Sequence, residues 1–85
     1  MEEFEVSLSD MKADQSGVVA KLHGGQAMVS KLATLGVRVG EEIKKISQQI
    51  MRGPVLIKVG KGQVAIGHGM ARKITIKIKE KKIQK

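Results

Sequence analysis

The stretch Lys31–Ile43, with the sequence KLATLGVRVGEEI, decides how this chain folds, because it sets two glycines among five aliphatic side chains. Gly36 follows an apolar residue, at a position where a helix that ends in the left-handed conformation favours glycine. Val37 then stands where such a closing motif makes a hydrophobic contact with the last helical turn. Gly40 predicts a second turn. The stretch therefore predicts a helix end, a short connection and a new element.

The residues before Gly36 carry the hydrophobic period of a helix. Met28, Leu32 and Leu35 are separated by four and three positions, so they fall on one stripe of a helical surface. A helix over residues 26–35 satisfies this spacing and ends where Gly36 predicts its end. We therefore expect one short helix of about three turns.

The residues after Gly40 fit a second helix on periodicity alone. Isoleucines at positions 43, 46 and 50 are spaced by three and four residues, and two glutamates precede them. Acidic residues are favourable at a helix N-terminus, and the isoleucines would share one helical stripe. The period therefore predicts an amphipathic helix over residues 41–51.

Alternating patterns near the two ends of the chain predict strands. Phe4, Val6 and Leu8 alternate with polar residues, which is typical of a half-buried strand over residues 4–8. Residues 17–23 form a second strand that is closed by two glycines and could pair with the first in antiparallel fashion. Residues 74–78 alternate isoleucine with threonine and lysine, and an outer face of lysines is a common protection of a sheet edge.

Glycines between these strands mark a hairpin. Residues 55–59 and 63–66 are apolar segments on either side of Gly60-Lys61-Gly62, which predicts a tight reversal. Met70-Ala71 is expected to form a single helical turn before the last strand. Short strands, glycine-rich turns and one inserted helix together predict a mainly β fold, a small closed or partly closed β-barrel.

The composition limits the functions that the chain can perform. Its 85 residues suffice for about one small domain, and Phe4 is the only aromatic residue, so the core must be aliphatic. The absence of cysteine excludes disulfides, thiolate metal sites and cysteine nucleophiles. The acidic N-terminus lacks the pattern of a signal peptide, and no apolar run approaches the ~20 residues that span a bilayer. We therefore expect a cytoplasmic protein.

Motifs for catalysis and cofactor binding are missing from the sequence. A GxxxxGK[ST] phosphate-binding loop is absent, and no serine, histidine and acid lie close enough in sequence to suggest a nucleophile with its base. His23 and His68 are the only imidazoles, and one histidine with dispersed ligands falls short of a usual metal site. The methionines are more typical of core packing than of metal ligation. We expect neither an enzyme nor a resident cofactor or metal.

The glycine-rich stretch resembles the FeoA family, in which a basic residue and a leucine precede a Leu-Gly pair, a second glycine and a later aliphatic residue. A second block is similar to the final three strands of that family, with an alanine before the last strand. The resemblance spans roughly residues 6–78. The positions that carry it are Lys31, Leu32, Leu35, Gly36, Gly40 and Ile43 in the first block, and Gly53–Val59, Val64–Ile66, Ala71 and Ile74–Ile76 in the second.

This resemblance implies a small SH3-like β-barrel with one short inserted α-helix. It implies a single domain over residues 1–79, a basic C-terminal tail over residues 80–85, and a strand rather than a helix over residues 41–47. It also implies a cytoplasmic accessory protein of ferrous iron transport that binds the membrane transporter FeoB and its GTPase domain. Such a protein acts through protein–protein contacts and supplies no catalytic residue.

Candidate contact residues lie at the end of the predicted helix. We do not expect the aromatic-lined peptide groove of SH3 domains, because Phe4 is the only aromatic residue. A partner contact would then use the helix and the turn that follows, although packing and capping explain the two leucines equally well. The candidate partner-binding residues are Lys31, Leu32, Leu35, Val37 and Arg38, with Arg38 and Lys31 preferred.

The net charge of +8 favours acidic partners, and cations gather near the C-terminus. Each cation near an anionic bilayer gains about 1 kcal/mol, so Lys77, Lys79, Lys81 and Lys82 are candidates for contact with an anionic membrane surface. A solvated face is the alternative interpretation of these lysines. The competing function is a basic SH3-like barrel that binds RNA. It would rely on backbone electrostatics alone, since the chain lacks aromatic platforms for base stacking.

Overall fold

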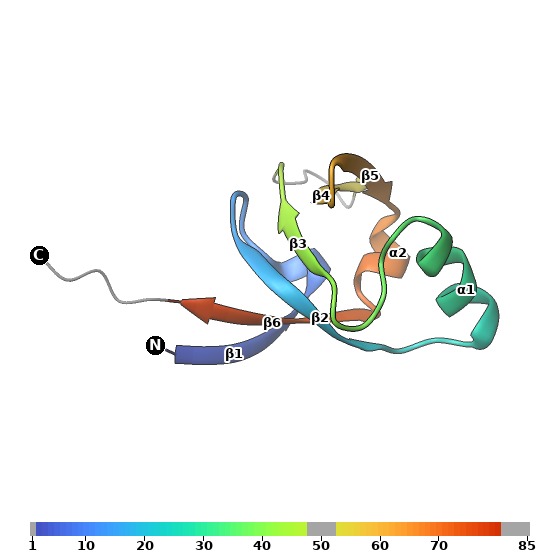
Figure 1. The fold of residues 1–85 in the computed structure, drawn as a ribbon, viewed down its shortest axis with the longest axis horizontal. Helices are drawn as coiled ribbons and strands as arrows, with labels where there is room; N and C mark the ends of the chain where they lie inside the picture. Colours follow the sequence, from blue (N-terminus) through green and yellow to red (C-terminus); the bar gives the residue numbers. More distant parts are fainter. Residues whose placement is uncertain (1, 48–52, 81–85) are drawn as a thin grey trace, which may run out of the picture.

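The computed structural model describes residues 2–47 and 53–80, which form one antiparallel sheet of six strands in the order β1-β6-β2-β3-β4-β5 (Figure 1). The two edge strands, β1 and β5, do not pair with each other within these residues, so the sheet stays open. The mainly β architecture with a short inserted helix is thereby confirmed. The strands are β1 Glu2–Ser7, β2 Ser16–Leu22, β3 Glu42–Lys45, β4 Val55–Val59, β5 Gly62–Ile66 and β6 Ile74–Glu80, and the helical segments are η1 Leu8–Asp10, α1 Gln26–Thr34 and α2 His68–Ala71.

The helix α1 ends as the glycine pattern predicts. Gly36 has φ +91° and Gly40 has φ +98°, which are left-handed conformations that glycine adopts without steric cost. The N–H of Val37 donates to the C=O of Leu32 at 2.8 Å, and the N–H of Gly36 donates to the C=O of Ala33 at 2.9 Å. These two bonds are the pair that defines a Schellman motif. They turn the chain back so that Val37 packs in the core beside the helix.

The last strand, β6, lies between β1 and β2, and this position overturns two predictions. β6 pairs with β1 on one side and with β2 on the other. The first two strands are therefore not neighbours, and the lysine-bearing strand is not a sheet edge. Its Ile74, Ile76 and Ile78 are all buried. A strand with this much apolar surface gains most from a central place in the sheet, where both neighbours shield it from water.

The strand β3 shows that the helix predicted over residues 41–51 is wrong in its described part. Ile43 is buried and pairs with Gly17 of β2 on one side and with Val59 of β4 on the other. Burial alternates along β3, with Glu42 and Lys44 outside, which is the period of a strand. The strand implied by the family resemblance is confirmed for Glu42–Lys45, and residues 48–51 lie outside the described part of the chain.

Lys45 conceals this period in the sequence, because a charged residue stands at a core position. Its side chain is 1% exposed. Its Nζ donates hydrogen bonds to the C=O of Ser9 at 3.2 Å and to the C=O of Met11 at 2.6 Å. Burial lowers the pKa of Lys45 below its usual value, and the charge of Asp10 opposes this shift. The lysine thus joins β3 to the η1 region.

The core lies on the inner face of the sheet and is aliphatic, as the composition requires. Close packing of β2 on β6 needs glycine at position 17, since a β-carbon there would collide with Ile76 and lie 2.7 Å from the carbonyl oxygen of Lys77. β4 and β5 form the predicted hairpin, and α2 is the predicted single turn. The buried apolar residues are Leu8, Met11, Val19, Leu32, Val37, Ile43, Val55, Ile57, Ile66, Ala71, Ile74, Ile76 and Ile78.

Candidate functional site

The contact residues predicted from the sequence separate into a buried and an exposed group. Leu32 and Val37 are both 0% exposed and belong to the core. Their backbones form the Schellman bond, so these residues fix the end of α1. A side chain without exposed surface does not contact a partner directly. The predicted contact residues that remain candidates are therefore Lys31, Leu35 and Arg38.

The exposed group includes two valines that the sequence analysis did not single out. Val39 is 62% exposed, and Val29 on α1 is 37% exposed, close to the 38% of Leu35. Lys31 and Arg38 are also exposed. The signal for Val39 was its place between Arg38 and a turn glycine, in the same short connection that made Arg38 a candidate. We call Lys31, Leu35, Arg38 and Val39 the helix-end surface. Val29 is left out, because residues two positions apart on a helix, such as Val29 and Lys31, do not share a face.

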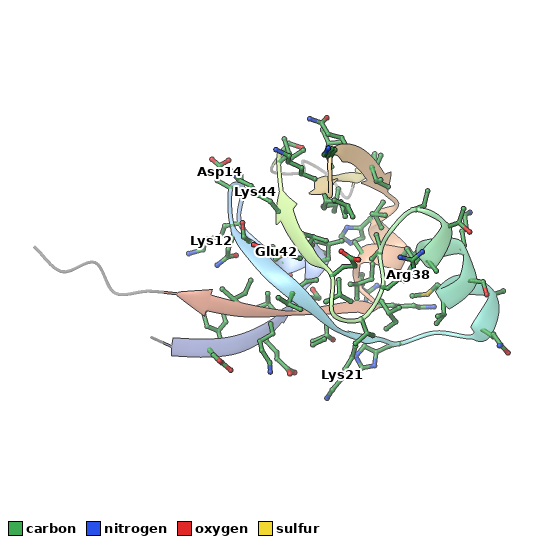
Figure 2. All side chains as sticks on the ribbon, viewed as in Figure 1. Lys12, Asp14, Lys21, Arg38, Glu42 and Lys44 are labelled. Carbon is green, nitrogen blue, oxygen red and sulfur yellow. The ribbon has the colours of Figure 1, made fainter. Side chains whose placement is uncertain are left out.

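Backbone hydrogen bonds hold the connection that carries Arg38 and Val39. The N–H of Gly40 donates to the C=O of Val19 at 2.8 Å. The N–H of Glu41 donates to the C=O of Arg38 at 3.0 Å, and Figure 2 shows Arg38 on this connection beside α1. Because β2 anchors the connection, the two side chains are presented from a fixed backbone. Such an arrangement reduces the conformational entropy lost when a partner binds.

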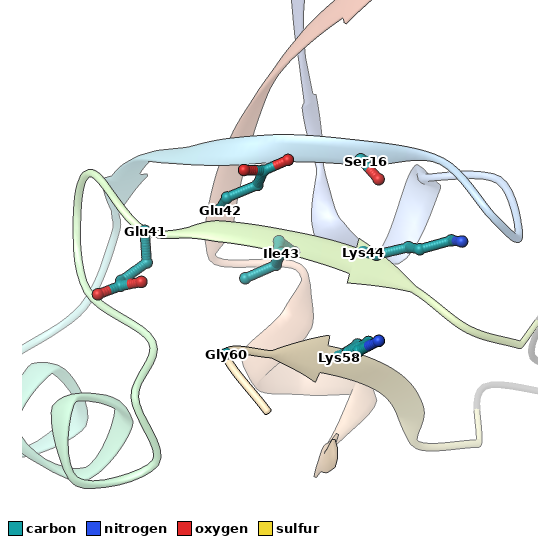
Figure 3. A pocket seen from close by; sticks show the side chains of 7 residues that line it. All are labelled: Ser16, Glu41, Glu42, Ile43, Lys44, Lys58 and Gly60. Atoms are coloured by element: carbon teal, nitrogen blue, oxygen red, sulfur yellow. The ribbon is translucent and has the colours of Figure 1, made fainter. Parts of the chain in front are cut away.

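A second surface, which was not predicted from the sequence, lies on the outer face of the sheet. A shallow hollow of about 370 Å³ crosses β2, β3 and β4 (Figure 3). Ser16, Lys44 and Lys58 stand on three adjacent strands toward one end, and Glu41 and Glu42 stand toward the other. We call this hollow the sheet groove; its lining residues are Ser16, Glu41, Glu42, Ile43, Lys44, Lys58 and Gly60.

The strand register explains the charges of the sheet groove. Lys44 is paired directly with Lys58 of β4, and Ser16 is paired with Lys44 from the side of β2. Gln63 of β5 stands opposite Lys58, so the row of four outward residues contains two cations and no carboxylate. The sequence gives no sign of this row, because its members are distant in sequence and only the pairing of strands brings them together.

The sequence matches the FeoA domain family over residues 6–78, a range that contains both surfaces. The chain belongs to the FeoA family. Its SH3-like fold is that of a crystal structure titled iron uptake regulatory protein (FeoA), with a TM-score of 0.82 and 32% identity over 88% of this chain and 100% of the other. The family is associated with Fe(2+) transport.

Two further comparisons place this FeoA-family chain among known proteins. A protein of Methanocaldococcus jannaschii named putative Fe(2+) transport protein A is 32% identical over 69 residues, which are 81% of this chain and 82% of that protein. A manganese-dependent transcriptional repressor matches with a TM-score of 0.79 and 16% identity over 89% of this chain and 42% of the repressor. At that identity the likeness concerns the fold alone.

The lysines predicted to meet an anionic surface are only partly described in this FeoA-family structure. Lys77 is exposed on β6, and its Nζ lies 4.0 Å from a carboxylate oxygen of Glu3. Lys81 and Lys82 lie outside the described residues, as does the side chain of Lys79. The membrane contact therefore stays a prediction.

The two histidines of this FeoA-family chain lie apart from any cluster of acids in the described residues. His23 has its Nε2 2.8 Å from the Oγ1 of Thr75, at the end of β2. His68 begins α2. Within residues 2–47 and 53–80, no three histidine, aspartate or glutamate side chains are grouped so that they could hold a metal ion. In the same part of the chain, no helix is both long and apolar enough to cross a membrane.

Proposed function

We propose that this chain is a cytoplasmic accessory protein of ferrous iron transport, and that it acts by binding the cytoplasmic part of an FeoB-like membrane transporter. Membership of the FeoA family carries this proposal, together with the name of the relative from Methanocaldococcus jannaschii. The partner would provide the GTPase and the membrane pore. The chain would act through contacts, since its sequence holds no phosphate-binding loop.

The helix-end surface is the best candidate for the contact with the transporter. It combines exposed apolar side chains, of which Val39 is the most exposed, with the cations Lys31 and Arg38. Protein interfaces typically bury apolar groups at their centre, and arginine is enriched in them. The fixed backbone of the connection supports such a role. An acidic, partly apolar face on the transporter would complement it.

A binding measurement with the purified transporter in nanodiscs tests this proposal. We expect the wild-type chain to bind and Arg38→Glu or Val39→Asp to bind at least about fivefold more weakly, a loss typical of a residue near the centre of an interface. Arg72→Glu is the matched control for Arg38→Glu, because Arg72 is exposed after α2 and its replacement changes the net charge by the same amount. The control should bind like the wild type.

Three results would contradict the proposal. Failure of the wild type to bind would remove the transporter as partner. Undiminished binding by both variants would remove the helix-end surface as the contact. If the chain instead recovered ribosomal RNA from a cell extract, with a steep salt dependence and no sequence preference, the RNA-binding alternative would replace the proposal.

Membrane contact through Lys77, Lys79, Lys81 and Lys82 would add to this function by holding the protein beside its transporter. Attraction to an anionic surface falls off within a Debye length and weakens with salt. Vesicles that contain phosphatidylserine should therefore bind the chain at low salt and release it at high salt. Equal binding to neutral vesicles would contradict this part of the proposal.

A further inference from the structure

We propose that the sheet groove binds an extended segment of a partner protein that carries an acidic and a basic residue two positions apart. This site is separate from the helix-end surface and does not depend on the proposed function. It rests on the arrangement of charges over three adjacent strands.

Two lysines on adjacent strands form the cationic end of the groove. Lys44 and Lys58 are directly opposed on adjacent strands, and like charges at such positions repel. In the described part of the chain neither lysine forms an ion pair, whereas Lys77 lies near Glu3. A carboxylate placed between the two ammonium groups would relieve the repulsion and accept charge-assisted hydrogen bonds from both. The hydroxyl of Ser16, which faces Lys44 across the strands, is a further donor.

The other end of the groove has the opposite sign. Glu42 lies two residues before Lys44 on β3 and points outward like it. Along a strand, side chains two positions apart stand on one face with a separation of about 6.6–6.8 Å. An extended partner segment has the same spacing. A segment with an acid at one position and a base two positions away therefore matches Lys44 and Glu42 at the same time.

The mixed charge of the groove favours a protein segment over a nucleic acid or a bilayer. Both of the latter present repeated negative charges, which would be repelled by Glu41 and Glu42 in the same hollow. Single-stranded nucleic acid also binds through aromatic stacking, and the only aromatic residue, Phe4, lies on β1 away from the groove lining. Only a ligand that carries both signs complements both ends.

Nuclear magnetic resonance titration of the ¹⁵N-labelled chain tests the proposal with two capped hexapeptides, TVDTRT and TVDRTT. The peptides have the same composition, but only the first places its two charges on one face when extended. We expect the first peptide to shift the amide signals of Ser16, Glu42, Lys44 and Lys58. The second should bind roughly three- to fivefold more weakly, which is the effect of one exposed ion pair.

Two variants with equal changes in net charge locate the site. Lys44→Glu should weaken binding of the first peptide roughly fivefold or more, because an attractive contact becomes a repulsive one. Lys21→Glu is the control, since Lys21 is exposed on β2 but pairs with Thr75 at the far end of the sheet. The dispersion of the amide spectrum reports whether each variant is folded, and Lys58→Glu replaces Lys44→Glu if the latter does not fold.

Two results would overturn the proposal. The first is equal affinity for the two peptides or undiminished binding by the folded lysine variant. The second is binding of polyuridylate RNA or of phosphatidylserine vesicles at these amides without peptide binding, which would mark a surface for polyanions. Neither result bears on the helix-end surface, and loss of transporter binding through Arg38→Glu leaves the groove untouched, so the two proposals fail independently.

Discussion

The end of α1 and the strand β3 are consecutive in the chain, yet they are governed by interactions of different range. At the end of α1, the bonds of the Schellman motif join residues three and five positions apart, from Gly36 to Ala33 and from Val37 to Leu32. In β3, Lys45 Nζ reaches the carbonyls of Ser9 and Met11, far earlier in the chain. Local chemistry determines the first region, and the tertiary fold determines the second.

This difference shows where a sequence pattern can mislead. The left-handed backbone angle at position 36 is enough by itself to favour glycine, so the prediction of Gly36 as the helix end does not depend on any distant residue. From the sequence alone, Lys45 is predicted to be a surface residue, because buried lysines are rare unless they are paired. Its carbonyl partners become known only from the structure. With Lys45 counted as polar, the alternation of β3 disappears and the isoleucine spacing suggests a helix.

The largest expected effect comes from removing the ammonium group of Lys45, which makes the tertiary contact. Lys45→Met keeps most of the side-chain volume but leaves the C=O of Ser9 and Met11 without their hydrogen bonds. Buried polar groups without partners destabilise a fold by about 1–3 kcal/mol. We expect the free energy of unfolding to fall by that amount in urea titrations at neutral pH.

The neighbouring residue provides the matched control for this change. Lys44→Met replaces an exposed lysine one position away, where the partner across the strands is Lys58. Surface substitutions usually change stability by less than about 0.5 kcal/mol, and removal of one of two opposed cations favours the fold. Equal losses for Lys44→Met and Lys45→Met would show that the carbonyl bonds do not stabilise β3.

A smaller effect is expected from the local contact at the end of α1. Gly36→Ala places a β-carbon on a residue with φ +91°, where it would also approach Val59 Cγ1 to 3.2 Å. A left-handed conformation costs other residues about 1–2 kcal/mol relative to glycine. Thermal unfolding should show a loss of this size for Gly36→Ala. Gly62→Ala, whose β-carbon has only one neighbour at 4.0 Å, should lose clearly less.

The sequence predicted those parts of the fold that depend on residues close together in the chain. The helix and its end, the β4–β5 hairpin and the single turn of α2 all follow from glycine positions and short periods. The strand order could not be predicted in this way. β6 enters between β1 and β2, with its three isoleucines in the core, and this placement is a property of the whole sheet.

The candidate sites divide in the same manner. The exposure of Lys31 and Arg38 follows from their charge and from the predicted turn. The sequence could not separate the buried Leu32 from the exposed Leu35, because both fit the apolar stripe and only contacts with the sheet decide which is covered. The sheet groove depends on the pairing of Lys44 with Lys58, which no local pattern contains.

The smallest expected effect is a pH dependence that isolates the charge of Lys45. Burial lowers its pKa in the folded protein below the ordinary value of 10.5, with Asp10 opposing the shift, so the unfolded chain holds the proton up to higher pH. Stability rises with pH wherever the unfolded state binds more protons. The burial penalty of Lys45 is therefore complete below the lowered folded pKa and disappears as pH rises to 10.5.

The difference in unfolding free energy between the wild type and Lys45→Met, measured in urea at several pH values up to about 10.5, should thus shift in favour of the wild type in the alkaline range. The other lysines are common to both proteins, so their titration cancels in this difference. A neutral amine still donates two hydrogen bonds, and the carbonyls of Ser9 and Met11 remain satisfied when the proton leaves. A difference that stayed constant would mean that Lys45 keeps an ordinary pKa when buried, and that the two carbonyls compensate fully for its desolvation. A difference that moved toward the variant would mean that the folded pKa lies above the ordinary value, and it would contradict the predicted direction.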